Sequence, residues 1–261
     1  MPLHVEVRGS GPPLVALHGF TQTGRLWGPF GERLAASRTV VAVDLPGHAG
    51  SDSVRADLAA TAELVTEAAR ATVGDAACDV LGYSLGARVA LHVVTGTDLG
   101  VRSMICIGGT AGIEDDAARE RRRQRDEALA EELESTGDVE GFLARWLAGP
   151  LFARLSATDA AGVAERHRNT APGLASSLRL CGAGTQEPLW DRLPEVASPL
   201  LALAGADDTR FASHALRMAA LAPQGAASLV PGGGHAVHLA QPVPTWRIVQ
   251  HWLESFEPGV I

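Results

Sequence analysis

The stretch CDVLGYSLGAR, residues 78 to 88, decides how this chain folds. It begins with an apolar run, passes through Gly82-Tyr83-Ser84-Leu85-Gly86 and opens an alanine-rich run. A G-x-S-x-G pattern in that setting is typical of a strand that turns sharply into a helix, with the serine hydroxyl exposed at the apex. We therefore expect an activated Ser84 at this turn. The simpler alternative is a tight glycine turn whose serine has no chemical role.

Similar apolar runs recur along the chain, and each ends at a glycine or a polar turn. They lie at 14–19, 39–47, 78–84, 101–109, 199–205 and 227–234. Runs that are apolar throughout are typical of strands covered on both faces. Helical stretches lie between several of them, at 54–73, 85–95 and 212–222. The alternation predicts an α/β fold with a mostly parallel sheet flanked by helices, and residues 3–11 add an edge hairpin.

The alternation stops between residues 111 and 190. Three stretches in this segment, at 115–136, 138–149 and 172–180, carry apolar residues at the three- and four-residue spacing of helices. The sequence therefore predicts a helical cap of residues 111–190, inserted into a core that residues 1–110 and 191–261 form together.

Composition narrows the class of protein. A chain of 261 residues is long enough for one core with a cap. The net charge of −8 disfavours nucleic-acid binding, which needs a positive surface. Three scattered cysteines, no signal peptide and no apolar run of about 20 residues predict a cytoplasmic protein that does not insert into membranes. No spacing of residues predicts a metal or an organic cofactor, and nothing in the sequence identifies a protein partner.

An activated serine needs a base within hydrogen-bond reach and an acid that orients the base. The strand at 199–205 is followed by Asp207 and Asp208, and the run at 227–234 by His235. Active groups of open parallel sheets gather at such carboxyl ends. Local chemistry leaves the two aspartates open. We prefer His235 to His238 as the base because His235 directly follows three glycines, which allow a close approach to the turn.

Backbone donors are expected beside the serine. His18-Gly19-Phe20 follows the first apolar run, so the Phe20 N–H can form an oxyanion hole with the Leu85 N–H. The alternative is an ordinary turn at the end of a strand.

Arginines are the other candidate binding groups. Arg88 lies one turn into the helix, on the same face as Ser84, so it can reach the floor of the site or pair with an internal acid. The run at 119–125 is flanked by acids, and most of it should face water. One of Arg166 and Arg168 can also face the cleft. Such a set would select a small substrate with several carboxylates.

Together these features resemble the α/β-hydrolase superfamily. The motifs LHGF, DLPGHAGSD, GYSLGAR, GADD and GGGHAVH stand in the family's order along the whole chain. In that superfamily the acid is commonly the aspartate of a G-x-x-D turn, which here runs from Gly205 to Asp208. The resemblance therefore favours Asp208 over Asp207.

A narrower resemblance involves the cap. GYSLGAR, GGTAGI, the arginine-rich helix before RDEALA, FLARW with PLF, and RHRNTAPGLASSLRLCGAGTQEPLW look like the 2-succinyl-6-hydroxy-2,4-cyclohexadiene-1-carboxylate synthases of menaquinone biosynthesis. Thr110-Ala111 and Ala87 depart from the family's pattern. The resemblance implies a lyase that eliminates pyruvate from 2-succinyl-5-enolpyruvyl-6-hydroxy-3-cyclohexene-1-carboxylate.

Site residues follow from this resemblance by motif. Ser84, assisted by His235 and Asp208, would abstract a ring proton, and the N–H groups of Phe20 and Leu85 would bind the developing charge. The implied substrate-binding residues are Arg88, Arg122, Arg166, Tyr83, Trp146, Phe152 and Gln186. Two alternatives stay open: a serine hydrolase of esters, thioesters or carbon–carbon bonds, and a ligand-binding protein without catalysis.

Overall fold

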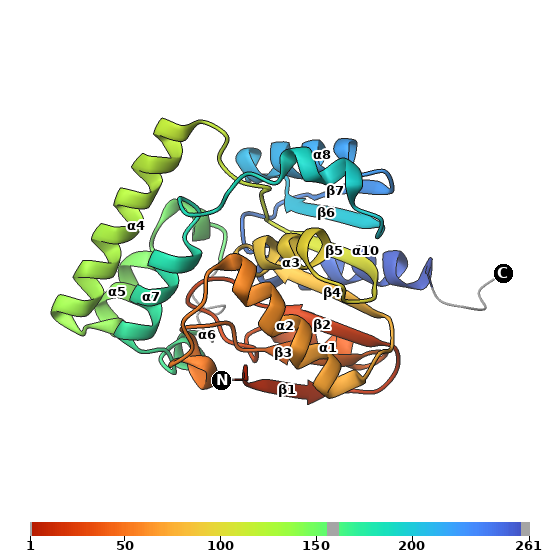
Figure 1. Ribbon diagram of the computed structural model, residues 1–261, viewed down its shortest axis with the longest axis horizontal. Helices are drawn as coiled ribbons and strands as arrows, with labels where there is room; N and C mark the ends of the chain where they lie inside the picture. The colour runs from red at the N-terminus through yellow and green to blue at the C-terminus, as the bar shows by residue number, and fades with distance from the viewer. Residues whose placement is uncertain (1, 156–161, 257–261) are drawn as a thin grey trace.

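A computed structural model of the chain describes residues 2–155 and 162–256. These residues contain a seven-stranded sheet in the order β1-β3-β2-β4-β5-β6-β7 (Figure 1). The strands are β1 (Val5–Arg8), β2 (Pro13–Leu17), β3 (Thr39–Val43), β4 (Cys78–Tyr83), β5 (Val101–Ile107), β6 (Leu200–Gly205) and β7 (Gly225–Val230). All neighbours are parallel except β1 and β3. The predicted α/β class with a mostly parallel sheet is confirmed.

The edge strand departs from the prediction. β1 lies at the edge, but it pairs antiparallel with β3, with Val5 opposite Val43, and so does not form a hairpin with β2. β2 is apolar and almost wholly buried, which suits a central place between two parallel partners. β1 is half-exposed and takes the edge instead. The expected edge hairpin is therefore wrong in its pairing.

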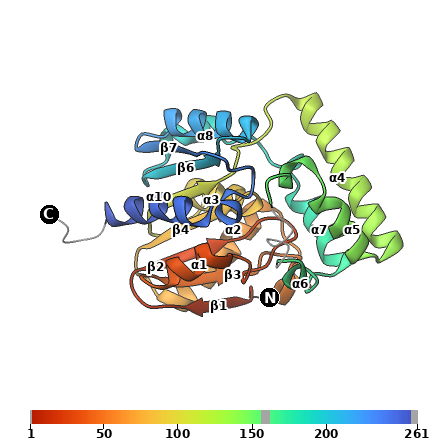
Figure 2. The same ribbon diagram turned by 180° about the vertical axis from the view of Figure 1, so that it is seen from behind.

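Helices cover both faces of the sheet (Figures 1 and 2). One face carries α2 (Leu58–Val73), α3 (Leu85–Gly96) and α8 (Thr209–Leu221), and the other carries α1 (Gly28–Ala35), α9 (Val237–Ala240) and α10 (Pro242–Glu254). Each layer encloses its own apolar cluster against the strands. The predicted helices at 54–73, 85–95 and 212–222 correspond to α2, α3 and α8.

The described residues between β5 and β6 include four helices beside the sheet; three of them pack together, and the short third one contacts the loop after β2. The four helices are α4 (Asp116–Thr136), α5 (Val139–Leu147), α6 (Gly162–Arg166) and α7 (Ala171–Cys181). The side chains of Asp115, Asp138 and Thr170 accept backbone N–H groups at the starts of α4, α5 and α7. Leu133, Phe142 and other apolar residues form a cluster of their own there. We call residues 111–190 the cap; its separation as a domain stays a prediction, and residues 156–161 lie outside the described residues.

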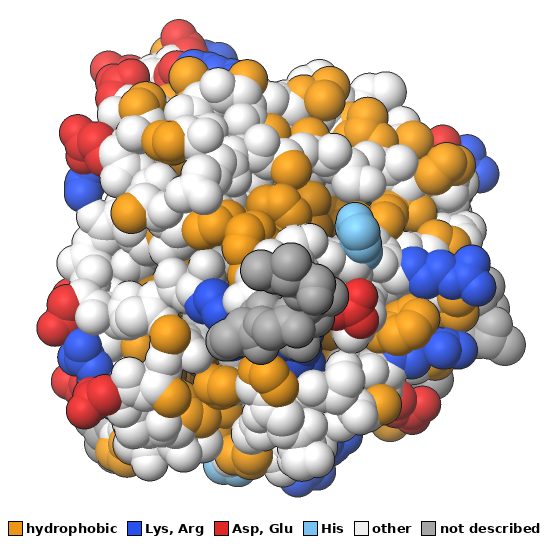
Figure 3. All heavy atoms as spheres, turned by 90° about the vertical axis from the view of Figure 1, so that its right-hand side faces the viewer, with side chains coloured by type: hydrophobic (Ala, Val, Ile, Leu, Met, Phe, Trp, Pro, Cys, Tyr) orange, Lys and Arg blue, Asp and Glu red, His pale blue; other side chains and the backbone are white. Residues whose placement is uncertain are grey.

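The cap lies over the carboxyl ends of the parallel strands, where ligands of open α/β sheets bind. Figure 3 shows the opposite end of the molecule, where hydrophobic side chains lie among polar and charged ones. None of the described helices is long and apolar enough to cross a lipid bilayer.

Candidate active site

Ser84 lies at the junction between β4 and α3 in a strained backbone conformation, with φ of 51° and ψ of −103°. The flanking glycines make this turn possible. A Cβ on Gly82 would lie 2.3 Å from the Gly86 carbonyl oxygen, and one on Gly86 would lie 1.9 Å from the Leu17 carbonyl oxygen. Both positions exclude any larger residue, so the G-x-S-x-G pattern follows from backbone packing.

The serine stands in a hydrogen-bonded series with His235 and Asp208. Ser84 Oγ lies 3.0 Å from His235 Nε2, and His235 Nδ1 lies 3.1 Å from Asp208 Oδ2. An ionised carboxylate only accepts, so Nδ1 carries the hydrogen and Nε2 is free to take the serine proton. Partial burial raises the pKa of Asp208, but the hydrogen bond and the electrostatic interaction with His235 outweigh burial, so the pKa of Asp208 is lowered overall. Asp208 therefore stays ionised at neutral pH.

The competing residues point elsewhere. Asp207 Oδ2 pairs with Arg154 at 2.8 Å. His238 is fully buried, with its ring centroid 4.3 Å from that of Tyr83. Burial is also the main cause that lowers the pKa of His238 to about 3, so that ring is neutral at pH 7. The geometry thus favours Asp208 and His235 over their neighbours.

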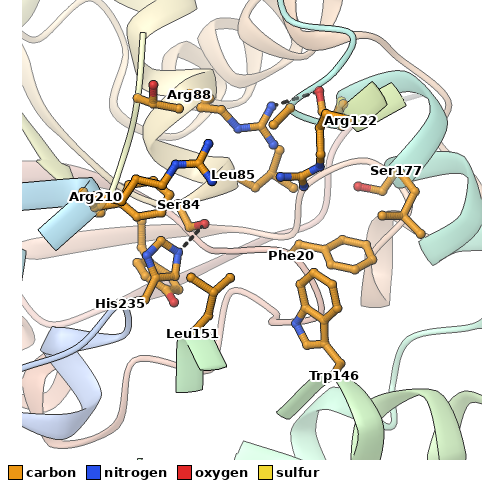
Figure 4. A pocket seen from close by; sticks show the side chains of 18 of the residues that line it. Phe20, Ser84, Leu85, Arg88, Arg122, Trp146, Leu151, Ser177, Arg210 and His235 are labelled. Carbon is orange, nitrogen blue, oxygen red and sulfur yellow. Dashed lines mark hydrogen bonds between the residues drawn. The ribbon is translucent and has the colours of Figure 1, made fainter. Parts of the chain in front are cut away.

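A pocket of about 900 Å³, its open mouth included, lies between the strand ends and the cap (Figure 4). Among the residues predicted for the site, its lining includes Phe20, Tyr83, Ser84, Leu85, Arg88, Arg122, Trp146, Phe152 and His235. The two candidate oxyanion donors thus belong to residues that line the same space as the serine hydroxyl. A lining of apolar side chains with a few polar and charged ones is typical of a site for a small organic molecule.

Aromatic side chains form one side of this pocket. The Trp146 ring contacts the Phe20 ring edge-on, with centroids 5.2 Å apart, and lies 6.2 Å from the Phe152 ring. Tyr83 is almost fully buried beside His235, at 5.4 Å between centroids. Trp146 and Phe152 of the cap thus form an apolar wall together with two aromatic side chains of the core.

Two of the predicted arginines line the pocket. Arg88 is 8% exposed and donates to the Gly182 carbonyl oxygen at 3.3 Å. Burial, with a smaller effect of the neighbouring Arg122, lowers the pKa of Arg88 to about 10, so it remains charged at pH 7. Arg122 Nε binds both oxygens of the buried Asp126, at 2.8 and 3.0 Å. Both arginines are therefore fixed in place before any substrate arrives.

Two of the predicted substrate-binding residues, Arg166 and Gln186, do not line the pocket. Arg166 is buried beneath it and donates to the Thr21 hydroxyl, whereas Arg168 is exposed and pairs with Glu165 at 2.6 Å. Of these two arginines, Arg166 is therefore the inner one. Gln186 is buried behind the wall, where its amide donates to the Thr110 carbonyl oxygen at 3.5 Å.

Sequence reasoning missed Arg210 and Phe211, which also line the pocket. Figure 4 shows the Arg210 side chain reaching toward the space above Ser84. The Phe211 ring packs against the His235 ring at 4.3 Å between centroids. Their place just after Asp208, at the start of a helix that follows a strand end, was the available signal.

Within residues 2–155 and 162–256, no group of three or more His, Cys, Asp or Glu residues is arranged to hold a metal ion.

Comparisons with known proteins agree with this geometry. Residues 14–247 match the model of the alpha/beta hydrolase family. A 2-succinyl-6-hydroxy-2,4-cyclohexadiene-1-carboxylate synthase from Serratia proteamaculans is 34% identical over 245 residues, which cover 88% of this chain and 89% of that protein. A synthase of the same name from Klebsiella pneumoniae is 32% identical over 232 residues, with coverage of 88% and 89%.

Two solved structures share the fold of this chain. MenH from S. aureus superposes with a TM-score of 0.90 at 27% identity, covering 97% of this chain and 98% of that one. A thermophilic esterase from Thermogutta terrifontis has a TM-score of 0.83 at 23% identity, covers 97% of this chain and 93% of that one, and shares the fold. The chain therefore belongs to the alpha/beta hydrolase family and, within it, to the 2-succinyl-6-hydroxy-2,4-cyclohexadiene-1-carboxylate synthase family.

Proposed function

We propose that this protein is a lyase of menaquinone biosynthesis that eliminates pyruvate from 2-succinyl-5-enolpyruvyl-6-hydroxy-3-cyclohexene-1-carboxylate. The product is 2-succinyl-6-hydroxy-2,4-cyclohexadiene-1-carboxylate, the compound after which the relatives are named. One observation carries the proposal: Arg88, Arg122 and Arg210 line the same pocket as Ser84 and His235. A hydrolase of neutral esters would have no use for three cations around its serine.

The proposed chemistry begins with proton transfer. Ser84 Oγ takes a proton from the ring while its own proton passes to His235 Nε2, 3.0 Å away. Asp208 stabilises the imidazolium ion through the Nδ1–H bond. The electron pair of the broken C–H bond forms one ring double bond, and the electron pair of the existing ring double bond shifts to form the second. The C–O bond to the enolpyruvyl group breaks, and the leaving enolate takes up a proton on carbon to become pyruvate. No water is consumed and no acyl-enzyme forms.

Charge stabilisation would come from the backbone. Negative charge delocalises onto a substrate oxygen during proton removal, and the N–H groups of Phe20 and Leu85 are the proposed donors to it. Both residues line the pocket next to Ser84.

The arginines would determine substrate specificity by binding carboxylate groups. Each charge-assisted bond to a carboxylate contributes roughly 1.5 to 3 kcal/mol. Arg88 and Arg122 are the proposed partners on the floor and on the side of the cap. Arg210 is the second residue of helix α8, lines the same pocket and would bind a third carboxylate.

The direct test is pyruvate release by the purified chain, coupled to lactate dehydrogenase, with p-nitrophenyl ester cleavage measured on the same preparation. The proposal predicts rapid pyruvate release with negligible ester cleavage. Ester cleavage without pyruvate release would assign the same triad to a hydrolase.

A further inference from the structure

The turn that carries the Phe20 N–H has an unusual conformation. Gly19 O accepts the Gln22 N–H at 3.0 Å, which closes a four-residue turn, and Gly19 N donates to Gln22 Oε1 at 2.9 Å. Thr21, the third residue, has φ of 67°. Glycine is the residue favoured at a turn position with positive φ, and a β-branched residue such as threonine rarely adopts that conformation. The surroundings must therefore hold the turn in place.

Two buried histidines hold the turn from the core side. His18 Nδ1 donates to Gly19 O at 2.8 Å, and His48 Nε2 accepts the Thr21 N–H at 3.3 Å. His48 Nδ1 in turn donates to the Pro46 carbonyl oxygen at 3.1 Å, which fixes its tautomer. Burial lowers the pKa of His18 to about 4 and that of His48 to about 3, so both rings are neutral at pH 7.

The cap holds the same turn from the other side. Asn169, between α6 and α7, is 4% exposed, and its Nδ2 donates to the Thr21 carbonyl oxygen at 2.8 Å. Its Oδ1 accepts the Ala49 N–H at 3.0 Å, so the orientation of the amide is fixed by two partners. Arg166 adds a bond to the Thr21 hydroxyl.

These contacts form a continuous path to the pocket. Asn169 binds the carbonyl of the Thr21–Gln22 peptide, whose N–H binds the carbonyl of the Gly19–Phe20 peptide. The N–H of that second peptide belongs to Phe20, the candidate oxyanion donor. Trans peptides are planar with C=O and N–H on opposite sides, so fixing each carbonyl sets the direction of the N–H beyond it. Bonds in such a series also polarise one another.

We propose that Asn169 is a positioning residue, contributed by the cap, that orients the Phe20 N–H toward the developing oxyanion through these two peptides. The inference rests on the proposed function, because it assumes that the Phe20 N–H receives charge during the reaction. It assigns to the cap a part in the chemistry besides substrate selection.

Asn169→Ala tests the proposal, with Asp52→Ala as the matched control. Asp52 accepts the neighbouring Thr170 hydroxyl, so the control also breaks a bond between cap and core but leaves the turn untouched. Asn169→Asp is the second variant, because it keeps the size and the acceptor for Ala49 but lacks the donor. It decides the question if Asn169→Ala does not fold.

Two readouts are needed: hydrogen exchange of a peptide covering residues 18–23, and the steady-state constants for pyruvate release. We expect exchange in that peptide to rise about tenfold and kcat to fall roughly 10- to 100-fold, with KM within about twofold, because the loss lies in the transition state. The control should match the wild type in both.

Unchanged exchange overturns the proposal, and so does faster exchange with unchanged kcat. A rise in KM alone would make Asn169 a residue that serves binding only. If the wild-type chain releases no pyruvate, the proposed function fails, and exchange by itself then decides whether Asn169 holds the turn.

Discussion

The sheet end and the cap contribute to the pocket in different ways. Ser84, Asp208 and His235 follow three strands of one sheet, and their positions are set by strand register. Arg122 projects from the long helix α4, whose other charged residues are exposed or half-exposed apart from its buried partner Asp126. Residues that directly follow parallel strands lie near one another, because the carboxyl ends of these strands meet at one edge of the sheet. In the cap, helix packing decides which side chain faces inward. We therefore propose that the core carries out the reaction and that selection is shared, with Arg88 and Arg210 on the core and Arg122 on the cap.

Ser84→Ala should have the largest effect. Turnover is expected to fall about a thousandfold or more, because the proposed base is lost. Stability should stay within about 0.5 kcal/mol, since alanine carries the same Cβ at the strained position. Pyruvate release and thermal unfolding measure the two. Turnover at the wild-type level would remove Ser84 from the chemistry.

Asp208→Asn and Asp207→Asn form a matched pair at adjacent positions. Asp208→Asn should lower kcat by roughly 10²- to 10⁴-fold, because the imidazolium ion loses its counter-charge. Asp207→Asn should leave kcat within about twofold, since Asp207 pairs with Arg154 instead. Equal losses in the two variants would contradict the assignment of the acid.

Arg122→Gln tests selection by the cap. We expect kcat/KM for the polycarboxylate to fall about 10- to 100-fold, mainly through KM, because one charge-assisted bond is lost. Arg123→Gln is the control, since Arg123 is exposed and pairs with Glu120. Labelling of Ser84 by a neutral fluorophosphonate should proceed at the wild-type rate in both variants. Slower labelling in Arg122→Gln would show that this arginine supports the triad as well.

Stability should fall as the pH drops from about 6.5 toward 4. The folded-state pKa values of His18, His48 and His238 lie below the ordinary value of 6.5 because burial disfavours their charged forms. The unfolded chain binds more protons in this range, so each histidine lowers the free energy of unfolding by about 1 kcal/mol per pH unit. Guanidinium unfolding at pH 7, 6 and 5 measures the slope. His238→Phe should reduce the slope of the unfolding free energy against pH, because it removes one buried histidine. An unchanged slope in this variant would show that the burial of His238 does not contribute to the pH dependence.

The same contrast explains what the sequence could predict. The strands followed from apolar runs, and Ser84 and His235 from glycine patterns and chain order. The preference for Asp208 over Asp207 came from the resemblance to the α/β-hydrolase superfamily. The pairing of β1 with β3 escaped prediction because a short amphipathic strand carries no sign of its partner. The choice between Arg166 and Arg168 depends on how a five-residue helix packs, and the Thr21 turn is held by contacts more than 140 residues away. Arg210 was missed because a charge at a helix start also suits a solvated surface.

The mass of the ring product tests the central claim most directly. The substrate is converted in water enriched in heavy oxygen, and the ring product is weighed by mass spectrometry. Elimination predicts the diene, which contains no oxygen from the solvent and is one water lighter than the product of hydrolysis. A ring product that retains a hydroxyl where the enolpyruvyl group was attached would contradict the lyase and assign the triad to hydrolysis.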